Sequence, residues 1–166
     1  MNKPSVLIFM GSKNDLPVMQ ETVNILISFG INYRLILASA HRTPEKVASL
    51  AKGAEAEGIQ VIIAGAGMAA HLAGNIAAHT ILPVIGVPIN SSLSGLDALL
   101  STVQMPGGIP VATLSVGKAG AKNAGLLAAQ ILALNSIELK TKLHAYRAKM
   151  AQQIEETNIE ITKNNE

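Results

Sequence analysis

The sequence predicts an α/β protein built around a parallel β-sheet, and two observations support this prediction. Short apolar runs alternate along the chain with stretches of helical composition, which is the pattern of repeated strand–helix units. The apolar runs are continuous rather than interrupted by polar residues, as expected for strands that helices cover on both faces. At 166 residues, the chain has the length of one domain.

The expected elements follow one another in regular order, from a strand at residues 6–10 to a long last helix. Five mostly apolar runs are expected to form strands, at residues 6–10, 33–38, 60–64, 84–87 and 110–114. The intervening segments are expected to form helices, at about residues 16–29, 44–57, 68–79, 95–103, 119–134 and 136–156. We expect a single domain over residues 1–157, followed by a frayed polar tail at 158–166.

Two of the helix starts have clear capping signals. Thr43, Pro44 and Glu45 supply a hydroxyl cap, a proline at the first helical position and an acid in the first turn. Asn135, followed three residues later by Glu138, resembles a capping box and predicts that the last helix begins there.

The last expected helix has one narrow apolar stripe, with charged residues over much of the remaining surface. The residues of the stripe are spaced three or four apart: Leu139, Leu143, Tyr146, Met150 and Ile154. Such a stripe packs either on the body of its own chain or on a neighbouring subunit, and the sequence leaves both alternatives open.

Charge and composition exclude several classes of protein. The net charge is only +2 and aromatic residues make up 2%, which argues against a nucleic-acid binder. The chain has no cysteine, so disulfides, thiolate metal sites and cysteine nucleophiles are excluded. The N-terminus lacks the apolar run of a signal peptide, and we expect a cytoplasmic protein.

The middle of the chain is unusually poor in charge. Residues 58–117 include one formal charge, Asp97. The longest stretch there without a polar side chain, 61–70, has ten residues, well short of the roughly 20 that span a bilayer. We therefore expect self-association, because obligate subunit interfaces resemble a protein core.

The residues that directly follow the expected strands predict a ligand site, because ligands of open α/β sheets bind beyond the carboxyl ends of the strands. Gly11, Ser12 and Asn14 follow the first strand and can offer backbone N–H groups and a hydroxyl to a phosphate. Arg42, after the second strand, can bind the same anion with its planar guanidinium. Asp15 can accept hydrogen bonds from a sugar diol, although it can also serve as a helix cap.

The loops after the second and third strands suggest what else the site binds and does. Gly65 and Gly67 allow the backbone to approach a flat ligand closely, so a phosphorylated sugar carrying a planar group fits the pattern. Histidine titrates near pH 6.5, and His41, beside Arg42 in a polar loop, is a candidate for proton transfer. His71 is either a hydrogen-bonded core residue or a second member of the site. With too few ligands close by, no metal site is expected.

Six segments, in order and at matching spacing between about residues 5 and 150, resemble the bacterial N5-carboxyaminoimidazole ribonucleotide mutases, the PurE family. They are Gly11-Ser-Lys-Asn-Asp15, Ser39-Ala-His-Arg-Thr-Pro44, Gly65-Ala-Gly-Met-Ala-Ala-His-Leu72, Leu82-Pro-Val-Ile-Gly-Val-Pro88, Gln104-Met-Pro106 and residues 117–132. The chain departs from the usual family pattern at Asn14, Met68, Ala73 and Ala98, none of which is a proposed catalytic group.

The resemblance implies a flavodoxin-like three-layer αβα sandwich with a five-stranded parallel sheet and an extra C-terminal helix. It implies a homo-octamer in which that helix reaches a neighbouring subunit. It also implies de novo purine biosynthesis, in which N5-carboxyaminoimidazole ribonucleotide becomes 4-carboxy-5-aminoimidazole ribonucleotide without metal or organic cofactor. The carbamate is expected to lose CO2 in a closed site, and carbon 4 is then carboxylated while a histidine moves the proton.

Carried over by motif, the family's roles fall on the same loops that the residue types had indicated. His41 matches the general acid/base of the family. The residues at its substrate and phosphate contact positions are Gly11, Ser12, Asn14, Asp15, Ser39, Arg42, Gly67, Ala70, His71 and Leu72. Of these, Asn14 stands where the family usually has serine, and its amide can still donate to a phosphate.

Two rival functions remain at this stage. The first is an aminoimidazole ribonucleotide carboxylase that uses free CO2 on the same scaffold. The second is a flavodoxin-like binding module, which is disfavoured because Gly65 and Gly67 end the third strand where a phospho-receiver needs an aspartate. A flavin carrier would also need aromatic side chains beside the site, and the expected loops contain none.

Overall fold

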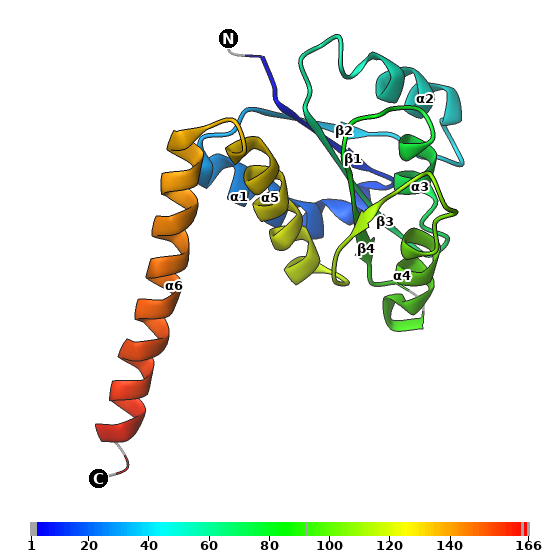
Figure 1. Cartoon of the computed structure of the whole chain (residues 1–166). Coiled ribbons are helices and arrows are strands. Elements are labelled where there is room, and N and C mark those ends of the chain that lie inside the picture. The colour runs from blue at the N-terminus through cyan, green and yellow to red at the C-terminus, as the bar shows by residue number, and fades with distance from the viewer. Residues whose placement is uncertain (1–2, 92, 164, 166) are drawn as a thin grey trace.

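The computed structural model describes residues 3–91, 93–163 and 165, and it has a five-stranded sheet at its centre (Figure 1). The strands are β1 (Val6–Met10), β2 (Tyr33–Leu37), β3 (Val61–Gly67), β4 (Val84–Ile89) and β5 (Ala112–Thr113). They lie in the order β2-β1-β3-β4-β5, and every neighbouring pair is parallel. This is the strand order of flavodoxin-like proteins, so the predicted fold class is confirmed.

Helices cover both faces of the sheet. The α-helices are α1 (Leu16–Phe29), α2 (Pro44–Gly53), α3 (Leu72–Ala77), α4 (Leu96–Val103), α5 (Lys118–Ala133) and α6 (Ile137–Lys163), with short 3₁₀ turns η1 (Lys13–Asp15) and η2 (Leu93–Gly95). Figure 1 shows α1 and α5 on one face and α2, α3 and α4 on the other.

The sheet separates two apolar cores, and the alternation of side chains along β1 explains why. Ile8 belongs to the core beneath α1 and α5, whereas Phe9 belongs to the core beneath α2 and α3. Both side chains are fully buried. A strand with both faces buried needs a continuous apolar sequence, which is the pattern that predicted the sheet.

Several element boundaries differ from those expected. β3 continues to Gly67, three residues beyond the predicted end at 64, and α3 begins at Leu72 rather than near 68. Met68 explains the late start of α3, because its φ of 56° is incompatible with a right-handed helix. β5 is limited to Ala112–Thr113, in part because Pro110 has no N–H to donate to a ladder.

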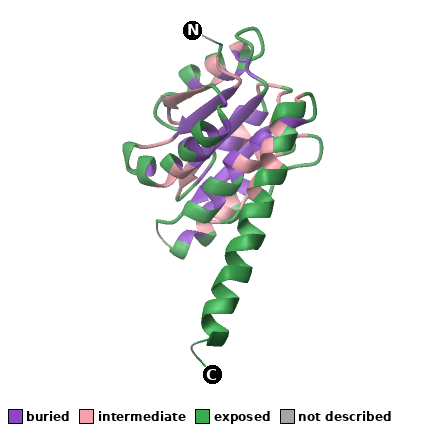
Figure 2. Ribbon diagram, turned by 90° about the vertical axis from the view of Figure 1, so that its left-hand side faces the viewer, coloured by how far each residue is buried: buried purple, intermediate pink, exposed green. Residues whose placement is uncertain are grey.

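Helix α6 is longer than predicted. Its apolar stripe was expected to pack either on the body of its own chain or on a neighbouring subunit, and only the first part of the stripe packs on the body. Leu139, Leu143 and Tyr146 pack against the core beneath α1 and α5. Met150 and Ile154, further along the stripe, are 51% and 69% exposed on the part of α6 that extends away from the body (Figure 2).

The end predicted for this helix near residue 156 was wrong. The segment expected to fray, 158–166, is helical as far as Lys163, while residues 164 and 166 lie outside the described part of the chain. Within the described residues, no helix is long and apolar enough to cross a bilayer.

Candidate active site

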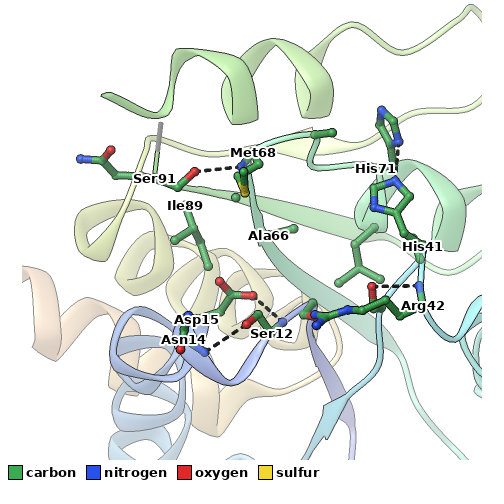
Figure 3. A pocket seen from close by; sticks show the side chains of 17 residues that line it. Ser12, Asn14, Asp15, His41, Arg42, Ala66, Met68, His71, Ile89 and Ser91 are labelled. Carbon is green, nitrogen blue, oxygen red and sulfur yellow. Dashed lines mark hydrogen bonds between the residues drawn. The ribbon is translucent and has the colours of Figure 1, made fainter. Parts of the chain in front are cut away.

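The strand order brings three loops together at the carboxyl edge of the sheet. Because β1 lies between β2 and β3, the loops that follow β2 and β3 lie on either side of the Gly11–Asp15 segment. The loop after β4 closes the remaining side. Together these loops line a cavity of about 600 Å³ that is open to solvent on one side (Figure 3), and its size suits a small organic ligand.

Ten of the eleven residues predicted for the site line this cavity: Gly11, Ser12, Asn14, Asp15, Ser39, His41, Arg42, Gly67, His71 and Leu72. Ala70 is the exception, because it is buried within the fold and does not line the cavity.

Ser12 and Asp15 form a reciprocal capping box at the start of η1. The Ser12 N–H donates to Oδ2 of Asp15 at 2.8 Å, and Oγ of Ser12 accepts from the Asn14 N–H at 3.3 Å. Burial raises the pKa of Asp15, while hydrogen bonds from the Ser12 and Gly11 backbone and the charge of Arg42 oppose this rise. The carboxylate therefore shapes the loop in addition to facing the cavity.

Arg42 links the loop after β2 to the loop after β1. Its Nη2 donates to the Gly11 carbonyl at 2.6 Å, and its backbone N–H donates to Oγ of Ser39 at 3.2 Å. The Ser39 N–H in turn donates to Oγ1 of Thr43 at 2.9 Å. One end of the guanidinium thus has a fixed partner. Its remaining N–H groups bond to no other residue that the structure describes, so they can be offered to an anion.

His41 and His71, from different loops, contact each other at one side of the cavity (Figure 3). Nε2 of His41 lies 2.8 Å from Nδ1 of His71, and the rings meet nearly perpendicularly, at 80°. The His71 side chain is exposed and lines the cavity, so it is not the buried core residue that was one of the two alternatives.

The backbone at the end of β3 lies close to the end of β4 and to the loop that follows it. A Cβ on Gly67 would lie 3.1 Å from the Ile89 carbonyl and 3.2 Å from Oγ of Ser91, so a larger residue is disfavoured there. Oγ of Ser91 accepts a hydrogen bond from the Met68 N–H at 3.1 Å. This bond helps to hold Met68 in its left-handed conformation.

Sequence reasoning did not assign every residue of the cavity wall. The unassigned lining residues are Ala40, Ala66, Met68, Ala69, Ile89, Asn90 and Ser91. The rule that ligands bind at the carboxyl ends of strands had already placed Asn90 and Ser91, which follow β4, at this edge, but it assigned them no specific role. Ser92 follows the same strand but lies outside the described residues. Across the described residues, no group of three or more His, Asp or Glu side chains could hold a metal ion.

The raised pKa of Asp15 predicts a specific dependence of stability on pH. Because the folded protein holds this proton more tightly than the unfolded chain does, the resulting stabilisation is fully present below the ordinary value of 3.8 and is lost as pH rises through the folded pKa. An Asp15→Asn variant lacks this dependence. The unfolding free energy of the wild type minus that of the variant is therefore expected to fall from pH 3.5 to pH 7. Urea denaturation at fixed protein concentration measures this difference in unfolding free energy. A difference that rises with pH would contradict the raised pKa of Asp15.

Fold and site together define the class of protein: a flavodoxin-like α/β protein with a pocket lined by arginine and histidine at the carboxyl edge of its sheet. Comparison with known proteins specifies this further. The family model described as AIR carboxylase matches residues 5–153. The chain belongs to this family.

Curated N5-carboxyaminoimidazole ribonucleotide mutases are similar to the chain over most of its length. That of Pyrococcus horikoshii is 57% identical over 93% of this chain and 86% of its own. That of Escherichia coli is 55% identical over 88% of this chain and 87% of its own. The crystal structure of Treponema denticola PurE is 34% identical and has a TM-score of 0.86, covering 95% of this chain and 98% of that one. These relatives identify the chain as an enzyme of the isomerase class, a mutase.

Proposed function

We propose that this mutase of purine biosynthesis converts N5-carboxyaminoimidazole ribonucleotide to 4-carboxy-5-aminoimidazole ribonucleotide, with His41 as general acid and base and with no cofactor. One observation carries the proposal: the anion-binding loop at Ser12, the guanidinium of Arg42 and the imidazole of His41 line one cavity of about 600 Å³. The phosphate of a ribonucleotide can bind to the Ser12 loop and to Arg42. Its aminoimidazole ring can exchange a proton with His41.

The proposed reaction breaks one bond to the carboxyl carbon and forms another. The N–C bond of the carbamate breaks, CO2 is released into the cavity, and His41 gives a proton to the nitrogen. Carbon 4 of the aminoimidazole then attacks the CO2, and His41 removes the proton from carbon 4. Protons balance over the cycle, so the enzyme ends in its starting state. Ala66, Leu72 and Ile89 give part of the cavity wall an apolar surface, which suits retention of CO2.

Two matched assays at neutral pH test the reaction and separate it from its rival. One supplies N5-carboxyaminoimidazole ribonucleotide, and the other supplies aminoimidazole ribonucleotide with bicarbonate; both follow formation of the 4-carboxylated product. Fast turnover in the first assay, with no comparable turnover in the second, supports the mutase reaction. Equal or faster turnover with the free amine would assign the protein to the CO2-using carboxylases, and no turnover in either would overturn both assignments.

Arg42→Ala is expected to weaken nucleotide binding by about 1.5–3 kcal/mol, the usual value of a charge-assisted hydrogen bond. Titration calorimetry with aminoimidazole ribonucleotide measures this loss. Lys46→Ala is the matched control, because Lys46 is also basic but donates to the Leu37 carbonyl and does not line the cavity. Unchanged affinity in Arg42→Ala would mean that the phosphate binds elsewhere.

The proposed enzyme is a cytoplasmic homo-octamer. Support for self-association comes from exposed apolar side chains in the charge-poor middle of the chain: Met68, Ile81, Leu93, Leu96, Leu100 and Val103. The last three are spaced four and three residues apart, so they share one side of α4. Sedimentation at micromolar concentration tests this assembly, and a monomeric mass would overturn it.

A further inference from the structure

Non-glycine residues with left-handed backbone occur at two places beside the cavity. Among the residues that the structure describes, they are Met68 with a φ of 56°, Leu93 with 46° and Ser94 with 54°. All three lie in the segments that follow β3 and β4, and of the three Met68 lines the cavity itself. Such a conformation costs free energy, so it persists where surrounding contacts impose it, and it is concentrated at functional sites.

Contacts to the end of β4 hold Met68 in this conformation. Its N–H donates to Oγ of Ser91 at 3.1 Å. The preceding residue, Gly67, lies so close to β4 that an added Cβ would be 3.1 Å from the Ile89 carbonyl. The backbone at residues 67 and 68 is therefore fixed by contacts outside its own loop, and these contacts offset the strain at Met68.

Met68 has the only long side chain in the segment that ends β3. Residues 65–70 have the sequence Gly-Ala-Gly-Met-Ala-Ala. Met68 is 59% exposed although it lines the cavity, so most of its surface is available to a ligand. A methionine side chain is flexible and polarisable, and it makes favourable contacts with aromatic rings.

The position of Met68 indicates which part of a ligand it meets. In Figure 3, Met68 lies across the cavity from Ser12 and Asp15, with Ser91 towards one side and the two histidines towards the other. A ribonucleotide whose phosphate binds at Ser12 and Arg42 extends its ribose, and then its ring, away from these two groups. The ring therefore approaches the wall formed by the loop after β3.

We propose that Met68 is a specificity-determining residue whose side chain covers the planar ring of the bound ribonucleotide. The left-handed backbone places this side chain at the cavity wall, and the hydrogen bond to Ser91 keeps it there. The contact strengthens binding of the ring and leaves binding of the phosphate unchanged. This inference rests on the proposed function, because the ring is that of an aminoimidazole ribonucleotide.

Three substitutions at position 68 separate a ring contact from an effect on the loop. Met68→Gly and Met68→Asn remove the long side chain, and both new residues tolerate a positive φ. Asparagine is less flexible than glycine, so it controls for a loop loosened by glycine. Met68→Leu keeps an apolar side chain of similar volume. Urea denaturation checks folding, and Met68→Gly should be at least as stable as the wild type because its backbone strain is relieved.

Titration calorimetry with two ligands measures the contact. One ligand is aminoimidazole ribonucleotide, and the other is ribose 5-phosphate, which lacks the ring. We expect Met68→Gly and Met68→Asn each to bind the ribonucleotide about three- to tenfold more weakly, the usual effect of removing one partly buried apolar contact. Both should bind ribose 5-phosphate within about twofold of the wild type, and Met68→Leu should bind both ligands within about twofold.

Three results would overturn the inference: no loss in either variant, an equal loss for the two ligands, or a loss confined to Met68→Gly, which would assign the effect to loop flexibility. A loss in Met68→Leu as large as that in Met68→Asn would also overturn it. Turnover of the carbamate by the wild type tests the proposed function separately. If turnover is absent, the proposed function fails, and the ring contact still stands or falls on the two affinities.

Discussion

His41→Asn is expected to lower kcat by about 10²- to 10⁴-fold, the usual contribution of a general acid–base group. The asparagine amide can still hydrogen-bond to Nδ1 of His71, but it cannot exchange a proton with the substrate. The anion-binding groups at Ser12 and Arg42 are unchanged, so affinity for aminoimidazole ribonucleotide should stay within about tenfold of the wild type. Single-turnover kinetics measure the first effect and calorimetry the second.

His144→Asn provides the matched control. His144 lies on the exposed surface of α6 and outside the cavity, so this variant should retain wild-type kinetics. If His41→Asn kept substantial activity, another residue would have to move the proton. If it lost activity and nucleotide binding together, His41 would be a binding residue instead.

The largest loss of stability is expected from Gly120→Ala. Gly120 lies in the first turn of α5, where an added Cβ would overlap the backbone carbonyl of Ser115. Neither atom belongs to a flexible side chain, so α5 or the loop after β5 must move. We expect the unfolding free energy to fall by about 3 kcal/mol or more, at or above the upper end of the usual range for overpacking.

Gly53→Ala is the control for this substitution, because Gly53 is also helical but has open space where its Cβ would lie. Since alanine favours helix more than glycine does, this variant should be unchanged or more stable by up to about 1 kcal/mol. Urea denaturation of both variants gives the comparison. Equal stability of the two would mean that the Ser115 loop moves away from α5 at little cost.

The fold was predictable because the central strands are buried on both faces. β1 has core on both faces, so Ile8 and Phe9 both had to be apolar, and a continuous apolar run was visible in the sequence. Helix ends were harder to place, because they depend on backbone conformation. Met68 favours helices by composition but lies in the left-handed region, where Ser91 holds it by a hydrogen bond from 23 residues away.

The candidate site was predictable as a set of loops but not as a set of contacts. Polar residues after the strands identified the edge at which ligands bind. The contact between His41 and His71 depends on strand order, which places their loops together across the end of β1 although the residues are 30 apart in sequence. Local patterns along the chain do not determine that order.

The part of α6 that extends beyond Tyr146 also offers a place for a spectroscopic probe. Residues 147–163 are helical, and at 1.5 Å per residue they extend roughly 25 Å. The chain contains no cysteine, so one cysteine introduced at Glu156 would attach one dye to each copy without background labelling. If the proposed oligomer forms, energy transfer between dyes on different copies would then report subunit exchange in real time.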